Sequence, residues 1–201
     1  KAAQIISELK PTLDSLDLPR GYHWEMGGEI ENAEEAQGYL FEYMPICFLL
    51  IAVLLVWQFN SFRRAGIILI TIPLTFIGAV IGLLVMNAPF GFMVILGLLS
   101  LAGIIINNGI VLLDRIEIEA NSGKNLYQAI LGAAIARFRP ILMTTLTTIL
   151  GLLPLILSKD PLFYGMACVI AFGLLVGTVL TLVVVPVLYS LFMRVEIPKQ
   201  A

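Results

Sequence analysis

Residues 100–114 of the chain read SLAGIIINNGIVLLD, and they lie inside a longer apolar segment at 92–113. A segment of this length can cross a bilayer, which takes about 20 apolar residues. Two adjacent amides, Asn107 and Asn108, therefore stand at a depth where hydrocarbon offers them no water. Polar side chains at that depth either serve a functional site or join neighbouring helices by hydrogen bonds. For the amides alone, both interpretations stay open.

The composition also places the chain in a membrane. Hydrophobic residues make up 59% of it and charged residues only 13%, whereas a soluble domain carries about 25% charged residues. A net charge of −2 without any basic stretch argues against nucleic acid as a partner. Cys47 and Cys168 lie in apolar segments and lack the spacing of a metal site or a disulfide. Because the chain starts at Lys1, we expect it to be part of a longer polypeptide.

The apolar segments predict an all-α membrane bundle at 41–194, followed by a cytoplasmic tail at 195–201. Its five transmembrane helices are expected at 41–59, 66–86, 92–113, 140–157 and 165–192. The segment 123–138 has apolar residues on one side and Lys124, Gln128 and Arg137 on the other. This pattern predicts a helix lying along the cytoplasmic membrane surface. A plain connecting helix packed on the bundle is the alternative.

Basic residues in the short flanks predict the orientation, because cytoplasmic loops carry an excess of Lys and Arg. The flanks after the first, third and fifth segments hold most of them, and the two opposite loops are neutral overall. The basic residues are Arg63, Arg64, Arg115, Lys124, Arg137, Arg139, Arg194 and Lys199. We therefore expect a periplasmic N-terminal segment and a cytoplasmic C-terminus.

Residues 1–40 have a different character, with a helical apolar pattern at 2–16, a turn at 19–21 and strand-like alternation at 22–26. A second helical pattern at 29–39 leads into the first apolar segment. A piece of this size has too little core to fold alone. The sequence thus predicts a small α/β piece at the end of a periplasmic domain, ahead of the helical bundle.

Small and polar residues recur at helical spacing within the apolar segments. Such faces let membrane helices approach closely and exchange hydrogen bonds. The glycines predicted to pack helices together are Gly78, Gly82, Gly103, Gly173 and Gly177. Close packing explains the glycines better than it explains the amides and hydroxyls that gather in the third and fourth segments.

The sequence contains no motif for enzyme catalysis or for ATP binding, so we expect a non-enzyme without a cofactor. The only histidine, His23, lies outside the apolar segments. The seven methionines are scattered, as is ordinary in membrane packing, and no metal site is predicted. Any pumping must then draw on an ion gradient or on another subunit.

Six motifs together carry a resemblance to a known family. They are LPRGY at 18–22, WQFNSF at 57–62, PLTFIG at 73–78, GIIINNGIVLLD at 103–114, RFRPILMTTLTTILGLLPL at 137–155 and VVVPVLY at 183–189. The chain resembles the C-terminal part of a resistance-nodulation-division (RND) efflux transporter, of the AcrB-like hydrophobe/amphiphile branch. The resemblance covers essentially the whole chain.

The resemblance implies a multi-pass protein of the bacterial inner membrane that is driven by the proton gradient. It also implies a homotrimer that works with a periplasmic adaptor and an outer-membrane channel. In this family a lysine of the proton relay stands where this chain has Asn107, followed by the matching Asn108. The relay threonine matches Thr144, and an arginine near the cytoplasmic entrance matches Arg137. An amide can hydrogen-bond a carboxylate but supplies no charge.

The resemblance therefore predicts half of a proton-driven antiporter that exports amphiphilic compounds or drugs. A heavy-metal exporter of the same superfamily is the first alternative, and a relative that moves protein or lipid is the second. A non-transporting assembly or sensor module would need no polar residues at membrane depth. Asn107, Asn108 and Thr144 argue against such a module.

Overall fold

The computed structural model describes residues 9, 11, 13, 15 and 19, and then 29–123 and 125–193. These residues contain five long helices that are apolar enough to cross a membrane, counting α2 from Glu35. The helices are α2 (Glu29–Phe59), α3 (Phe62–Met86), α4 (Phe92–Asn121), α5 (Leu126–Ser158) and α6 (Tyr164–Phe192). The chain divides into two compact units, Lys1–Tyr43 and Met44–Ala201.

The expected α/β piece before the bundle is wrong for the part of the chain that the structure describes. In the first unit, Leu9, Pro11 and Leu13 are helical and α2 begins at Glu29, and the described residues contain no strand. The strand-like segment 22–26 and the motif at 18–22 lie outside the described residues apart from Pro19. A single strand has no partner for its backbone hydrogen bonds unless another strand lies beside it. The described residues provide no such strand.

Residues in the left-handed conformation follow three of the helices. Asn87 (φ 49°) and Lys159 (φ 50°) follow α3 and α5, and their backbone N–H groups donate to carbonyls of the last helical turn. Asn60 (φ 45°) lies between α2 and α3. Asparagine tolerates the left-handed region better than most residues, which explains the stop after α2 and α3.

The segment 126–138 differs from the expected separate surface helix. It forms the first part of α5, which runs without interruption through Pro140 to Ser158. Proline removes one N–H and leaves the carbonyl of Ala136 without its usual helical donor, but this need not end a membrane helix. Ala129 and Ala133 are fully buried, so this part of α5 packs on the bundle.

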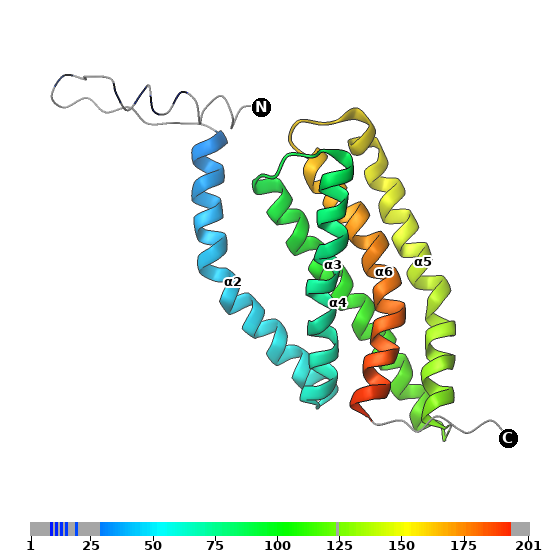
Figure 1. Ribbon diagram of the computed structural model, residues 1–201. Coiled ribbons are helices and arrows are strands. Elements are labelled where there is room, and N and C mark those ends of the chain that lie inside the picture. Colours follow the sequence, from blue (N-terminus) through cyan, green and yellow to red (C-terminus); the bar gives the residue numbers. More distant parts are fainter. Residues whose placement is uncertain are drawn as a thin grey trace. The chain divides into compact units, whose positions relative to one another are not determined.

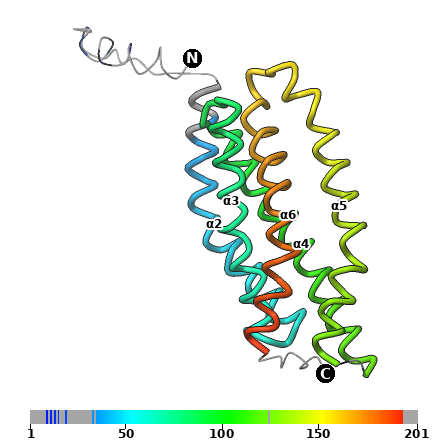
Figure 2. Tube along the Cα trace, turned by 45° about the vertical axis from the view of Figure 1, so that its right-hand side comes forward, coloured from blue at the N-terminus to red at the C-terminus, as the bar shows by residue number. Residues whose placement is uncertain are grey.

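In the second unit, α6 lies between α3, α4 and α5 and contacts all three, as Figures 1 and 2 show. The α6 segment is also the most buried of the five spans, whereas almost all of the α2 span is exposed. One hydrogen bond joins the start of α6 to the end of α3, from the Tyr164 hydroxyl to the Met86 carbonyl at 2.9 Å. The bundle is thus organised around α6.

Candidate functional site

The two adjacent asparagines of α4 lie in different surroundings. Asn107 is exposed, whereas Asn108 is 8% exposed and its Nδ2 has no hydrogen-bond partner among the described residues. Successive residues of an α-helix point about 100° apart, so only one of the two can face the interior of the four packed helices. The adjacent Gly109 places α4 close to Ile68 of α3. The structure therefore separates Asn107 from Asn108 by environment.

The threonines of α5 show the same division. Thr144 is exposed and its hydroxyl donates to the Ile141 carbonyl at 2.9 Å. Its neighbour Thr145 is buried and shares a 2.7 Å hydrogen bond with Thr178 of α6. The buried hydroxyl therefore joins two helices, and the exposed one bonds only within its own helix. Sequence reasoning had not singled out Thr145 and Thr178.

Arg137 lies on the same side of α5 as Thr144, because a separation of seven residues spans about two helical turns. Its side chain is partly buried, and its Nε has no hydrogen-bond partner in the described part of the chain. No hydrogen bond or ion pair between described residues joins Arg137, Asn107 and Thr144. Among the described residues, none of these three polar groups has a hydrogen-bond or ion-pair partner on another helix.

Four of the five predicted packing glycines lie at close helix contacts. A Cβ built on Gly78 would stand 2.5 Å from Val176 Cβ, and one on Gly82 would stand 2.5 Å from Phe172 Cβ. A Cβ on Gly173 would overlap Leu101 Cδ2, and one on Gly177 would lie 2.7 Å from Thr75 Cγ2. At Gly103, by contrast, the described residues leave no atom within 4 Å of such a Cβ.

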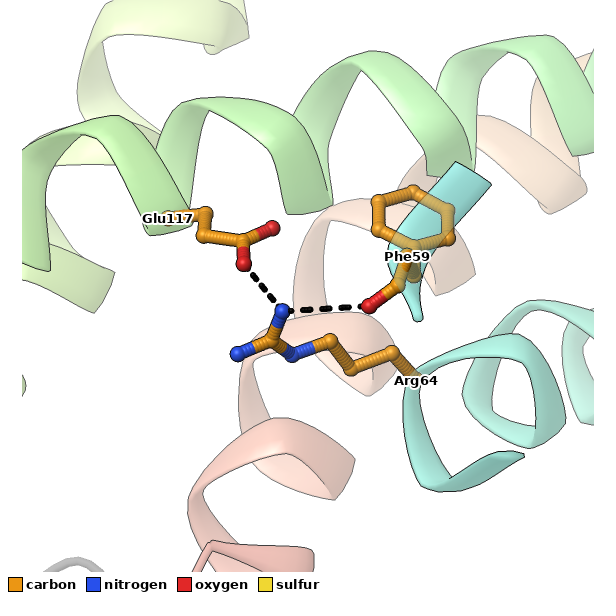
Figure 3. A network of polar contacts seen from close by, with 3 residues as sticks. All are labelled: Phe59, Arg64 and Glu117. Atoms are coloured by element: carbon orange, nitrogen blue, oxygen red, sulfur yellow. Dashed lines mark hydrogen bonds and ion pairs between the residues drawn. The ribbon is translucent and has the colours of Figure 1, made fainter. Parts of the chain in front are cut away.

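A charged contact that sequence reasoning missed lies where α2 meets α3. Arg64 Nη1 donates to Glu117 Oε1 of α4 and, at 3.4 Å, to the carbonyl of Phe59 at the end of α2, as Figure 3 shows. A second ion pair, from Arg115 to Glu119, lies within α4 at 2.6 Å. Sequence analysis used both arginines only as markers of orientation. The sequence did hold a signal for such contacts, because acidic and basic residues lie close together at 114–119, directly after the apolar segment of α4.

These features define a multi-pass membrane protein whose helices pack through small residues and carry amides and hydroxyls. The chain matches the model of the AcrB/AcrD/AcrF family over residues 2–193. It belongs to this family of RND efflux transporters, which confirms the resemblance drawn from the motifs.

Named relatives include proteins of two kinds. The chain is 32% identical to the nickel and cobalt resistance protein CnrA of Cupriavidus metallidurans, over 96% of this chain and 18% of that protein. It is 29% identical to the multidrug resistance protein MdtC of Pantoea ananatis, over 98% of this chain and 20% of that protein. The chain thus spans about a fifth of the length of these relatives.

A solved structure has a similar arrangement of helices. It is the crystal structure of a heavy metal efflux pump, with a TM-score of 0.74 and 28% sequence identity. The match covers 96% of this chain and 20% of the pump. The helical arrangement described above is therefore one that occurs in an efflux pump.

Proposed function

We propose that this chain forms part of a proton-driven antiporter that exports amphiphilic compounds. The observation that carries the proposal is the exposure of Asn107 and Thr144 on two membrane-length helices of an RND protein. Polar groups at that depth are costly against lipid and are expected to face a protein partner or a water-filled cavity. We propose Asn107, Asn108, Thr144 and Arg137 as the proton-coupling residues of this chain.

The coupling partners are proposed to be intramembrane carboxylates in another part of the complete protein, as the family resemblance implies. Asn107 would donate a hydrogen bond to the ionised form of such a carboxylate. An amide stabilises the ionised form less than the family's lysine does, so the pKa of the carboxylate would be lowered less. Arg137 would be the cation that remains near the path of the proton.

Metal ions are a second candidate substrate. Two proteins support this alternative by their names, the nickel and cobalt resistance protein CnrA and the solved heavy metal efflux pump. Each is similar to 96% of this chain. The identity to MdtC is only slightly lower than that to CnrA, so it does not decide between the two substrate classes.

The complete protein, reconstituted in vesicles with an inward proton gradient, tests the function. We expect the protein to move a lipophilic cationic dye against the direction of proton flow. The same measurement should show that the proton gradient decays faster when the dye is present. Nickel, cobalt and zinc are offered separately, with vesicles lacking the protein as the control. Proton movement with a metal and none with a panel of dyes would favour the second candidate. No proton movement with either class would contradict proton-driven export of both.

We propose that the complete protein forms a homotrimer in the lipid bilayer. We also propose that the trimer binds a periplasmic adaptor and an outer-membrane channel. The family resemblance supports them. Cross-linking of the complete protein in cells, followed by mass measurement, tests the trimer. Recovery of monomer alone at normal expression would contradict it.

The proposed orientation places the α3–α4 and α5–α6 connections on the periplasmic side. Asn87 and Lys159 have positive φ, so probes are better placed at the nearby Phe90 and Leu162, which are 69% and 39% exposed. In a background without native cysteines, single cysteines there should react with an impermeant thiol reagent from outside the cell. A cysteine at Ser122 should stay unlabelled until the membrane is permeabilised. Labelling of Ser122 in intact cells would reverse the orientation.

A further inference from the structure

The contact around Arg64 joins three helices at one point. Its Nη1 approaches a carboxylate of α4 and a carbonyl at the end of α2, while Arg64 itself lies in the first turn of α3 (Figure 3). The Arg64 and Glu117 side chains are 24% and 33% exposed, so water screens them only partly. The last carbonyls of a helix have no intrahelical donor, and Arg64 supplies one to Phe59. One guanidinium nitrogen thus serves both neighbours.

The guanidinium is incompletely satisfied in this arrangement. Its Nε is buried and has no partner among the described residues. Arginine has five N–H donors in a rigid fork that fits a carboxylate with two parallel hydrogen bonds. Here Glu117 receives a bond from Nη1 only. The fork is therefore not used in full in this arrangement.

The connection between α2 and α3 leaves little slack. It consists of Asn60, with φ 45°, and Ser61. Leu55 and Phe59 of α2 are buried in the same apolar cluster as Leu113 and Ile116 of α4. A shift of α4 near Leu113 and Ile116 would therefore displace the end of α2.

Few other charged or titratable groups lie near this point among the described residues. Tyr189 of α6 is buried in the same cluster, where it contacts Arg64 through a side-chain hydrogen bond and lies within electrostatic reach of Arg64 and Glu117. The Arg115–Glu119 pair lies on α4 beside Glu117. Asn107 lies ten residues before Glu117 on α4, about 15 Å along the helix axis at 1.5 Å per residue. A rigid α4 therefore connects the charged contact to a proposed coupling residue.

We propose that Arg64 is a positioning residue that alternates between two arrangements during the transport cycle. In the arrangement seen here, Nη1 joins the end of α2 to Glu117. In the other arrangement, the guanidinium forms two hydrogen bonds to Glu117 and the Phe59 carbonyl is released. The switch links movement of α4 to the α2–α3 connection, and it rests on the proposed proton-coupled transport for its role in the cycle.

Distance measurements between spin labels on the complete protein test the switch. Labels at Phe62 on α3 and Ile118 on α4, which are 82% and 50% exposed, report the separation of these helix ends. In reconstituted protein we expect two distance populations whose ratio changes when a proton gradient is imposed. Arg64→Lys keeps the charge but removes the fork, so it should leave one population in both conditions.

Transport measurements give a second readout. Arg64→Lys and Glu117→Gln are expected to lower proton movement per substrate by about fivefold or more, a modest coupling between sites. Arg63→Gln, a change at the exposed neighbouring arginine, is the matched control and should keep wild-type coupling. The exchange of charges in Arg64→Glu/Glu117→Arg should recover part of the loss if the pair acts directly.

The outcomes separate this inference from the proposed function. A single, unchanging distance population in the wild type overturns the switch, whatever the protein transports. Two populations that respond to the gradient in a protein that moves none of the offered substrates support the switch and contradict the substrate assignment. Equal loss of thermal stability and transport in Arg64→Lys, with both distance populations retained, would reduce Arg64 to a structural contact and overturn the proposal.

Discussion

Asn107→Leu in the complete protein is expected to lower substrate-dependent proton movement at least about tenfold, with normal expression and assembly. A hydrogen bond to a charged group contributes about 1.5–3 kcal/mol, and about 1.4 kcal/mol corresponds to a factor of ten. In the variant, the carboxylate that pairs with Asn107 in the wild type would lack this hydrogen bond in its ionised form. Because Asn107 is exposed in this structure, the change leaves no cavity in the described core.

Thr144→Val should act in the same direction, because it removes a hydroxyl of similar depth and exposure. Thr147→Val is its matched control, since Thr147 is also exposed and also donates within α5, to the Met143 and Thr144 carbonyls. The measurement is proton movement in vesicles at equal amounts of folded protein. Unchanged coupling in both Asn107→Leu and Thr144→Val would leave helix packing as the better account.

Asn107→Lys introduces the cation that the family resemblance implies at this position. A lysine at membrane depth is costly unless an acidic group, a backbone carbonyl or a water-filled cavity satisfies it. A folded and active Asn107→Lys protein would thus support carboxylates facing α4. A protein that fails to fold with this change would count against an acidic group facing Asn107.

Gly78→Ala and Gly82→Ala are expected to destabilise the bundle by about 1–3 kcal/mol each, as is typical of overpacking. The new Cβ atoms would stand 2.5 Å from the Cβ atoms of Val176 and Phe172, which are fixed to the α6 backbone and cannot rotate away. At Gly78 the Phe172 carbonyl oxygen also lies 3.1 Å away. The helices must therefore separate, and they lose contacts along their length.

Gly103→Ala is the control for these two changes. The described residues leave open space at this position, and alanine favours a helix over glycine by about 1 kcal/mol. Unfolding of the complete protein in mixed detergent micelles measures all three changes. Equal stability of Gly78→Ala and Gly103→Ala would contradict the close approach of α3 and α6. Marked destabilisation by Gly103→Ala alone would indicate a partner for α4 beyond the described residues.

The position of the membrane-length helices followed from the sequence because each depends on a local property. About 20 apolar residues in a row cannot remain in water, whatever lies around them. Local reasoning failed at residues 1–40, where it predicted an α/β piece and the described residues contain no strand. A strand depends on a partner strand that may be distant in sequence, so alternation within 22–26 did not suffice.

The sequence proposed candidate coupling residues but did not show which of them are buried. Periodicity placed Asn107 and Asn108 together in one segment, yet a difference of one residue moves a side chain to another face. Only packed helices show that Asn108 is buried and Asn107 is not. The same applies to Thr144 and Thr145, because only the position of α6 gives Thr145 its partner, Thr178.

The sequence by itself determined that this protein crosses the membrane and belongs to the RND transporters, because hydropathy and motifs depend on residues that are neighbours in sequence. The tertiary structure alone decided which glycines touch another helix and which charges meet. Gly78 and Val176, like Arg64 and Glu117, are far apart in sequence, and their contacts depend on the register between helices. That register is set by the fit of side chains across whole interfaces, which no local pattern records.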